Sequence, residues 1–164
     1  MTEGQTLYAT GKWRGAVAAL PHEAKALNSH SCLMLSMLHQ LGLGTDPNME
    51  NAKAALSHCA EAWDADSLAR LSQLYKIQGN DKEWMAWRIK AAHVGHRSSI
   101  CNLAEMYSNK PEARETLNKE VEYLQKAVRA EHTCYYTHKH TKSRFSKSNQ
   151  DRIAMLQQRL AELH

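Results

Sequence analysis

The chain has 164 residues, which is the length of one domain and is enough to bury a substantial core. It contains only 7 Gly and 3 Pro, and its abundance of Ala, Leu, Lys, Glu and Gln favours helix. No run approaches the roughly 18 apolar residues of a membrane span, so a transmembrane helix is excluded. The first residues lack a basic region followed by an apolar core, and we expect neither a secretory signal nor a membrane partner.

The first two predicted helices form an irregular pair. Leu7 and Tyr8 mark one short helix, and a second covers residues 14–27 with a kink expected at Pro21. Terminal repeats are commonly atypical because they close the end of an array. We therefore interpret this pair as a capping unit.

Six longer helical patterns follow. Ser29 or Ser31 caps the first, which runs to about Leu41 and is ended by Gly42 and Gly44. The next four are expected at residues 49–63, 66–78, 82–93 and 98–107. The last begins at 111 and runs to about 130, with the proline at its start.

The helical pattern stops after residue 131. Residues 132–147 show no apolar period of either kind. Ser148 and Asp151 then resemble a capping box, and a final helix follows with its leucines on one stripe. The sequence thus predicts a repeat array over 1–131, a basic aromatic loop over 132–147 and a capping helix over 148–164.

An internal repeat organises the array. Taking Gly95 as an anchor, Trp87 lies eight residues before it, Leu103 eight after and Tyr107 twelve after. The same template recurs at three other anchors, so that the four are spaced 36, 32 and 36 residues apart: Leu27, Trp63, Gly95 and Glu131. A period of this size built from two short helices is typical of a helical solenoid.

These residues resemble the Sel-one-like repeat (SLR) family, which is related to tetratricopeptide repeats. Residues 35–44, L-S-M-L-H-Q-L-G-L-G, are similar to the family's L-G-x-L-Y-x-x-G-x-G, with His39 in place of the usual Tyr. The family's second-helix pattern, K-A-x-x-W-Y-x-K-A-A-x-x-G, is echoed at 51–60, 83–95 and 119–131, although Trp63 and Glu131 replace its Gly and the loop after Tyr75 is four residues short.

The resemblance covers roughly residues 5–132. It implies an all-α, right-handed α–α solenoid of about four helix-turn-helix repeats with a C-terminal capping helix. Many members are bacterial, and they act as adaptors, scaffolds and regulators that hold other proteins or peptides.

The chain contains four cysteines and no C-x-x-C pair. Cys59 occupies the small-residue packing position that Ala91 occupies in the next unit. Free cysteine behaves as a small buried hydrophobe, and reduced thiols are typical of the cytosol. We therefore expect free thiols and a cytoplasmic protein.

The first helix of each pair supplies a candidate binding surface, because in such solenoids these helices line the concave face. On the first helix of each of three pairs, two positions between the core residues and a third position beyond them point outward. They are Met34, Arg70 and Asn102, then Met37, Gln73 and Glu105, and then Gln40, Lys76 and Ser108. The methionines beside polar side chains suit an adaptable protein-binding groove. The alternative is that each position is an ordinary solvated one.

A second candidate is the basic segment 132–147. Residues 129–152 hold six basic and two acidic residues, so the whole net charge of +4 arises there. The side chains concerned are Tyr135, Tyr136, Lys139, Lys142, Arg144 and Lys147. They could neutralise phosphates and stack on bases, or meet an acidic protein. A solvated loop accounts for them equally well.

A metal site is the third candidate, since the same segment offers four ligands in nine residues: His132, Cys134, His138 and His140. Their spacing does not match the usual tetrahedral zinc motifs, and we expect no metal. No nucleophile–base set or phosphate-binding loop is recognisable, so we expect no enzyme activity and no cofactor.

The sequence therefore predicts a non-catalytic module, monomeric when free, that binds a protein or peptide on the concave face. One alternative is a cytosolic immunity protein that neutralises a bacterial toxin by direct binding. A second is a nucleic-acid binder that uses the basic segment.

Overall fold

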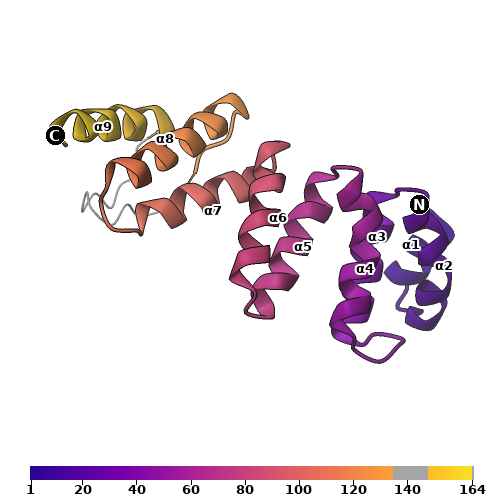
Figure 1. Cartoon of the computed structure of the whole chain (residues 1–164). Helices are drawn as coiled ribbons and strands as arrows, with labels where there is room; N and C mark the ends of the chain where they lie inside the picture. The colour runs from indigo at the N-terminus through magenta and orange to yellow at the C-terminus, as the bar shows by residue number, and fades with distance from the viewer. Residues whose placement is uncertain (135–147, 164) are drawn as a thin grey trace. The chain divides into compact units, whose positions relative to one another are not determined.

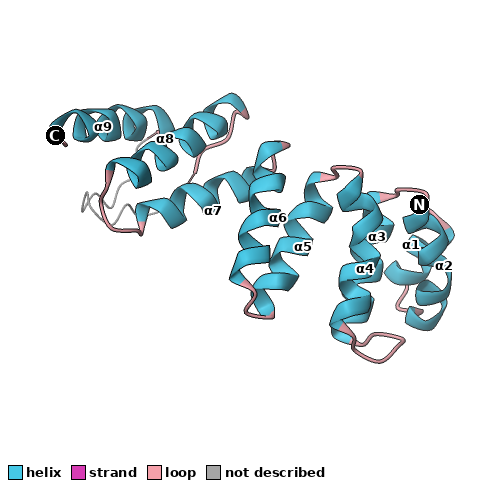
Figure 2. Cartoon of the chain, viewed as in Figure 1, coloured by secondary structure: helices cyan, strands magenta, loops and turns pink. Residues whose placement is uncertain are grey.

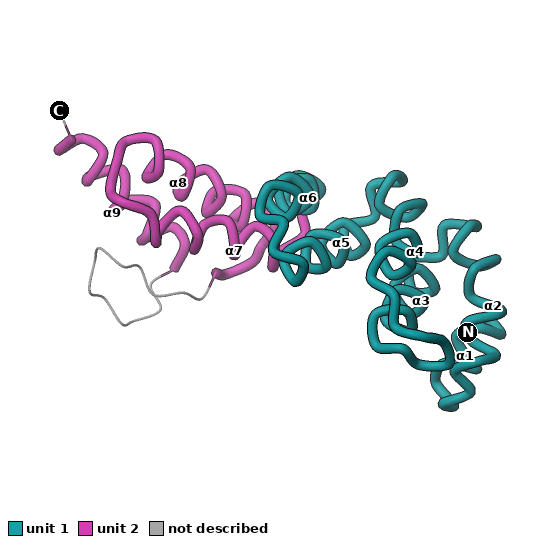
Figure 3. The backbone as a smooth tube through the Cα atoms, turned by 60° about the horizontal axis from the view of Figure 1, so that its bottom comes forward, with its two compact units in different colours: residues 1–94 teal, residues 95–164 magenta. Residues whose placement is uncertain are grey.

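The computed structural model describes residues 1–134 and 148–163. Within these ranges the chain forms nine helices and no strand, which confirms the all-α prediction (Figures 1 and 2). The chain divides into two compact units, Met1–Val94 and Gly95–His164 (Figure 3). No helix in the described part is both long and apolar enough to cross a membrane.

Unit 1 is built from consecutive helix pairs. Its helices are α1 (Glu3–Ala9), α2 (Trp13–Lys25), α3 (Ser29–Leu41), α4 (Met49–Glu61), α5 (Ala65–Ile77) and α6 (Asp81–His93). Each helix packs on the next, while α3 also contacts α1 and α5, and α2 also contacts α4. The odd-numbered helices therefore line one face and the even-numbered helices the other, which is the packing of an α-solenoid.

Unit 2 contains α7 (Arg97–Ser108), α8 (Arg114–Arg129) and α9 (Asn149–Glu162). α7 packs on α8, and α9 covers α8 with Leu156 buried. The backbone amide of Asp151 donates to Ser148 Oγ at 3.2 Å, so the expected start of the last helix is confirmed. The handedness and the number of repeats stay predictions.

The four repeat anchors adopt the same backbone conformation. Leu27, Trp63, Gly95 and Glu131 have φ values of 60°, 60°, 91° and 50°. At the three anchors that are not glycine, the following amide reaches back to a helix carbonyl, in the hydrogen-bond pattern of a Schellman motif. These bonds are Asn28 N to Glu23 O, 3.2 Å, Asp64 N to Cys59 O, 3.0 Å, and His132 N to Ala127 O, 3.0 Å. A left-handed turn thus ends the second helix at every predicted anchor.

The turn also determines where the next helix begins. Asn28, Asp64 and His96 directly follow an anchor, and their side chains cap the next helix. They accept hydrogen bonds from the backbone amides of three fully buried serines, Ser31, Ser67 and Ser99. The cap expected at Ser29 or Ser31 is therefore one to three residues late, and the helices expected to begin at 66 and 98 begin one residue earlier, at Ala65 and Arg97. α8 likewise begins after Pro111, and α2 continues through Pro21.

All four cysteines lie in the described residues and are paired, Cys32 with Cys59 and Cys101 with Cys134. Their Cα–Cα distances of 6.6 and 5.2 Å lie within the usual disulfide range of about 4.4–6.8 Å. The prediction of free thiols is wrong. Cys59 fills a small-residue position on α4, whereas the repeat positions equivalent to Cys32 on α3 are Leu68 and Ile100. α3 packs on α4, and this contact brings the two sulfurs together.

Candidate functional site

The predicted concave-face residues of unit 1 lie on α3 and α5, which contact one another. We call this surface the first-helix face: Met34, Met37, Gln40, Arg70, Gln73 and Lys76. The first four are half-buried and the last two are exposed. The structure therefore brings together the part of the predicted set that lies in unit 1.

Arg70 is held in place at the centre of this face. Its Nη1 donates to Gln73 Oε1 at 3.0 Å, and its Nη2 donates to Gln40 Oε1 across the α3–α5 boundary. Its Nε is buried, and no acceptor among the described residues reaches it. Burial lowers the pKa of Arg70, and the nearby Tyr8 opposes this shift. The guanidinium is thus partly desolvated and pre-positioned, and its buried Nε–H has no acceptor among the described residues.

Apolar and aromatic side chains adjoin this arginine. The Tyr8 hydroxyl donates to Met37 Sδ at 3.8 Å, and the Tyr8 ring stacks on Trp13 with centroids 6.4 Å apart. Sequence reasoning assigned Tyr8 only to a capping helix, yet its place on the first helix of a pair was a signal that it could join this face. Tyr, Met and Arg are enriched at the centres of protein interfaces.

Three predicted positions behave differently. Lys76 Nζ lies 2.6 Å from Asp81 Oδ1 and 4.5 Å from the centre of the Trp84 ring, so it is directed to the α5–α6 turn. Asn102 and Glu105 are exposed on α7, in unit 2. Ser108 is buried and donates to the Glu105 carbonyl at 2.8 Å, which makes its expected exposure wrong.

Most of the predicted basic segment lies outside the described residues, including Tyr135, Tyr136, Lys139, Lys142, Arg144 and Lys147. The residues on either side of it are fastened together. Asn149 accepts from the Cys134 amide at 3.1 Å and donates to the His132 carbonyl at 2.7 Å. Arg152 donates to the Cys134 carbonyl at 2.9 Å. The chain therefore leaves and re-enters the described structure at one place.

The metal hypothesis loses a ligand. The Cys134 sulfur is bonded to Cys101 and is not available as a thiolate. His138 and His140 lie outside the described residues. In the part of the chain that the structure describes, no three His, Cys, Asp or Glu side chains gather as a metal site would require.

No protein-family model matches the chain, and no curated protein matches it. The resemblance to SLR proteins consequently stays a prediction. Its local consequences can still be compared with the structure, since the paired helices and the left-handed anchors follow the spacing of the sequence repeat.

Proposed function

We propose that this chain is a non-catalytic binding module of the SLR type, which holds a protein or peptide on its first-helix face. The observation that carries the proposal is the state of Arg70. Its guanidinium is fixed by Gln40 and Gln73, is partly desolvated, and retains a buried Nε–H without an acceptor. A carbonyl or carboxylate of a partner could accept a charge-assisted hydrogen bond from the half-exposed side of this guanidinium.

The neighbours of Arg70 support the same function. Met34 and Met37 offer unbranched apolar side chains that can adapt to a partner, and Tyr8 adds a rigid aromatic ring. A side chain already held in its binding conformation loses little entropy on association. This combination favours recognition of a partner's surface over chemistry.

Several roles share this mode of binding. An adaptor or scaffold would hold a cellular partner, whereas an immunity protein would occupy the active site of a toxin; the identity of the partner separates them. Nucleic-acid binding through the basic segment 132–147 is the remaining alternative, and it predicts a steep loss of affinity with salt.

The paired cysteines change the proposed location. Disulfides persist in oxidising compartments and are rare in the cytosol. Both pairs are largely buried, with Cys32, Cys59 and Cys134 at most 1% exposed. We therefore propose an oxidising compartment as the location of the protein, in preference to the cytoplasm expected from the sequence.

The test is a pull-down from the native host at moderate and high salt, with the intact wild type, Arg70→Ala and Lys82→Ala as baits. Lys82 is an exposed lysine on α6 that is not one of the residues of the first-helix face, and it is the matched control for loss of one positive charge. We expect one stoichiometric protein that survives high salt. Arg70→Ala should weaken it by about 30-fold, the effect of an interface hot spot, and Lys82→Ala should not.

A partner bound equally by both variants would refute the first-helix face. The double variant Arg70→Glu with Gln73→Ala gives a stronger form of the same test, because it reverses the central charge. Recovery of nucleic acid at low salt alone would transfer the function to the basic segment.

A further inference from the structure

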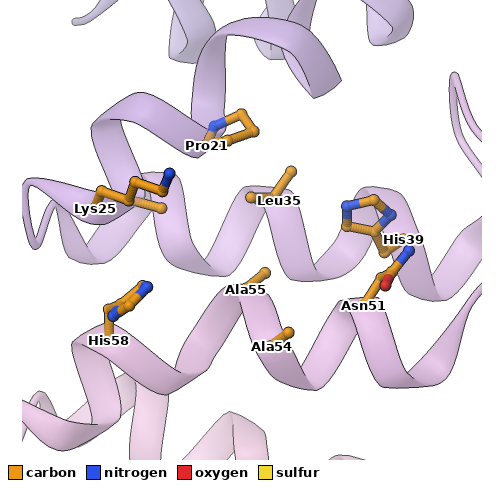
Figure 4. A pocket seen from close by; sticks show the side chains of 9 residues that line it. Pro21, Lys25, Leu35, His39, Asn51, Ala54, Ala55 and His58 are labelled. Carbon is orange, nitrogen blue, oxygen red and sulfur yellow. The ribbon is translucent and has the colours of Figure 1, made fainter.

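Unit 1 contains a cavity of about 240 Å³ between α2, α3 and α4 (Figure 4). Leu35, Ala54 and Ala55 form its apolar middle. Leu35 and His39 lie on the side of α3 turned away from Met34 and the rest of the first-helix face, as the 100° step per residue requires. The cavity therefore opens on the other face of the unit.

Its polar groups stand at two ends. Figure 4 shows His39 and Asn51 near one end of the cavity and Lys25 and His58 near the other. Asn51 and His58 are seven residues apart on α4, which separates the ends by about 10 Å along the helix. Among the described residues that line the cavity, none is acidic.

The internal repeat explains why there is space here. Ala55 lies eight residues before its anchor, and the same position is Trp87 in the next repeat and Tyr123 in the one after. Each of these rings is covered by a lysine three residues later. Lys90 Nζ lies 3.9 Å from the centre of the Trp87 ring, and Lys126 Nζ lies 4.8 Å from that of Tyr123. In α4 the ring is replaced by a methyl group, and His58 takes the place of the lysine.

The wall of the cavity that α3 forms also differs from another repeat at an aromatic position. His39 lies twelve residues after its anchor, where unit 2 has Tyr107. Tyr107 stacks on Tyr123 with ring centroids 5.9 Å apart and planes inclined by 14°. The cavity is thus the place where an aromatic ring would stack on His39 if the chain supplied one.

We infer that this cavity binds a tryptophan or tyrosine side chain of a partner protein, flanked by acidic residues. This is a second binding surface, independent of the first-helix face. Its volume of about 240 Å³ exceeds the ~150 Å³ that suffice for benzene in an apolar protein cavity. The ring would stack between His39 and the apolar middle, and the acidic neighbours of the ring would reach towards Lys25 at the other end.

The polar groups select the kind of ring. His39 Nδ1 is buried without a partner among the described residues, so a ligand in the cavity can meet the imidazole only through its other ring nitrogen. Burial lowers the pKa of His39, so the imidazole is neutral at neutral pH and has a nitrogen that can accept a hydrogen bond. An indole N–H or a phenol O–H can donate to it, whereas phenylalanine and leucine cannot. Lys25, at the other end of the cavity, favours a carboxylate on a residue next to the ring.

The experiment uses the full chain and the peptide acetyl-Asp-Trp-Asp-amide, with acetyl-Asp-Leu-Asp-amide as control. Binding is followed by NMR on the methyl groups of Leu35, Ala54 and Ala55. We expect the tryptophan peptide to shift these signals with a Kd of about 1 mM, and the leucine peptide to bind about tenfold more weakly. Equal binding of the two peptides would overturn the inference of an aromatic ligand.

A variant that fills the cavity locates the site. Ala55→Trp restores the residue type of Trp87, so we expect the fold to persist and binding of the tryptophan peptide to fall about tenfold. Ala86→Trp adds the same side chain at an exposed position of α6 and should change nothing. Unaltered binding to Ala55→Trp would refute the site.

Two further variants keep the test decisive. If Ala55→Trp does not fold, His39→Leu removes the stacking ring and the acceptor, and it should weaken the tryptophan peptide about tenfold while sparing the leucine peptide. Equal affinities of the wild type and of His39→Leu for the tryptophan peptide would overturn the inference. Arg70→Ala should leave binding of the tryptophan peptide unchanged. The proposal for the cavity and the proposal for the first-helix face can therefore fail separately.

Discussion

Replacing Glu23 by glutamine should loosen the N-terminal helix in a pH-dependent manner. The Glu23 carboxylate on α2 accepts three hydrogen bonds that fasten α1 and α3 to it. Thr2 Oγ1 and Ser31 Oγ donate at 2.6 Å each, and the Gly4 amide donates at 2.8 Å. Glutamine keeps one acceptor oxygen but loses the charge and the second acceptor.

The expected loss in free energy of unfolding at pH 7 is about 1–2 kcal/mol, the lower part of the range for hydrogen bonds to charged groups, because Glu23 is half-exposed. Burial raises the pKa of Glu23, but hydrogen bonds from Ser31, Thr2 and Gly4 outweigh it, and the pKa is lowered. The carboxylate therefore stabilises the fold above its ordinary pKa of about 4.3, and this stability disappears as the pH falls through the folded-state pKa.

Urea unfolding followed by tryptophan fluorescence measures this effect in the intact protein. The four tryptophans, Trp13, Trp63, Trp84 and Trp87, all lie in unit 1, so their emission reports that unit. Glu3→Gln is the control, since Glu3 is an exposed carboxylate on α1. The reasoning is refuted if Glu23→Gln matches Glu3→Gln at pH 7. It is equally refuted if the loss persists undiminished at about pH 2, below the ordinary carboxyl range.

Three further predictions concern the backbone and the disulfides. Gly44→Ala should lower the free energy of unfolding by about 3 kcal/mol or more, because φ is +76° and a Cβ would lie 2.5 Å from the backbone of α2. Gly79→Ala is the control: φ is +73° there too, but a Cβ meets nothing within 4 Å, so the loss should be only about 1 kcal/mol. Glu131→Gly should raise the free energy of unfolding by about 1 kcal/mol, measured by circular dichroism in urea, because φ is 50° there. Cys32→Ala with Cys59→Ala should lower the stability of unit 1 by about 3 kcal/mol in the fluorescence assay.

Each has an outcome that would count against it. Equal losses for the two glycine variants would show that the close approach to α2 does not matter. A loss of stability on Glu131→Gly would mean that the glutamate side chain makes up for its backbone strain. If a reductant leaves the stability of unit 1 unchanged in the wild-type protein, this would argue against a stabilising Cys32–Cys59 bond.

The repeat period was the most informative feature of the sequence. It placed anchors at Leu27, Trp63 and Glu131, and the structure has a left-handed backbone at each, although none of these residues is glycine. Spacing is imposed by the packing of whole helix pairs, which outweighs a local conformational cost of about 1–2 kcal/mol. Residue preference alone would not have predicted positive φ at Trp63.

What the sequence missed depends on contacts between elements. The disulfides could not be predicted, because Cys32 and Cys59 are far apart in the chain and meet only when α3 packs on α4. The cap of α3 was misplaced because Ser29 and Ser31 are caps as good as Asn28 by residue type. Arg70 was predicted as an outward position, but its bonds to Gln40 and Gln73 follow from the α3–α5 contact.

Each disulfide stays inside one unit, and this has a mechanical consequence. The bonds close loops with sequence separations of 27 and 33 residues. If the oxidised chain is pulled from its ends, the residues inside the two loops cannot extend, which removes roughly 90 and 110 Å of contour length at about 3.4 Å per residue. Tension then passes through the two bridges, one in each unit. The oxidation state of the cysteines therefore sets how far the protein can be stretched.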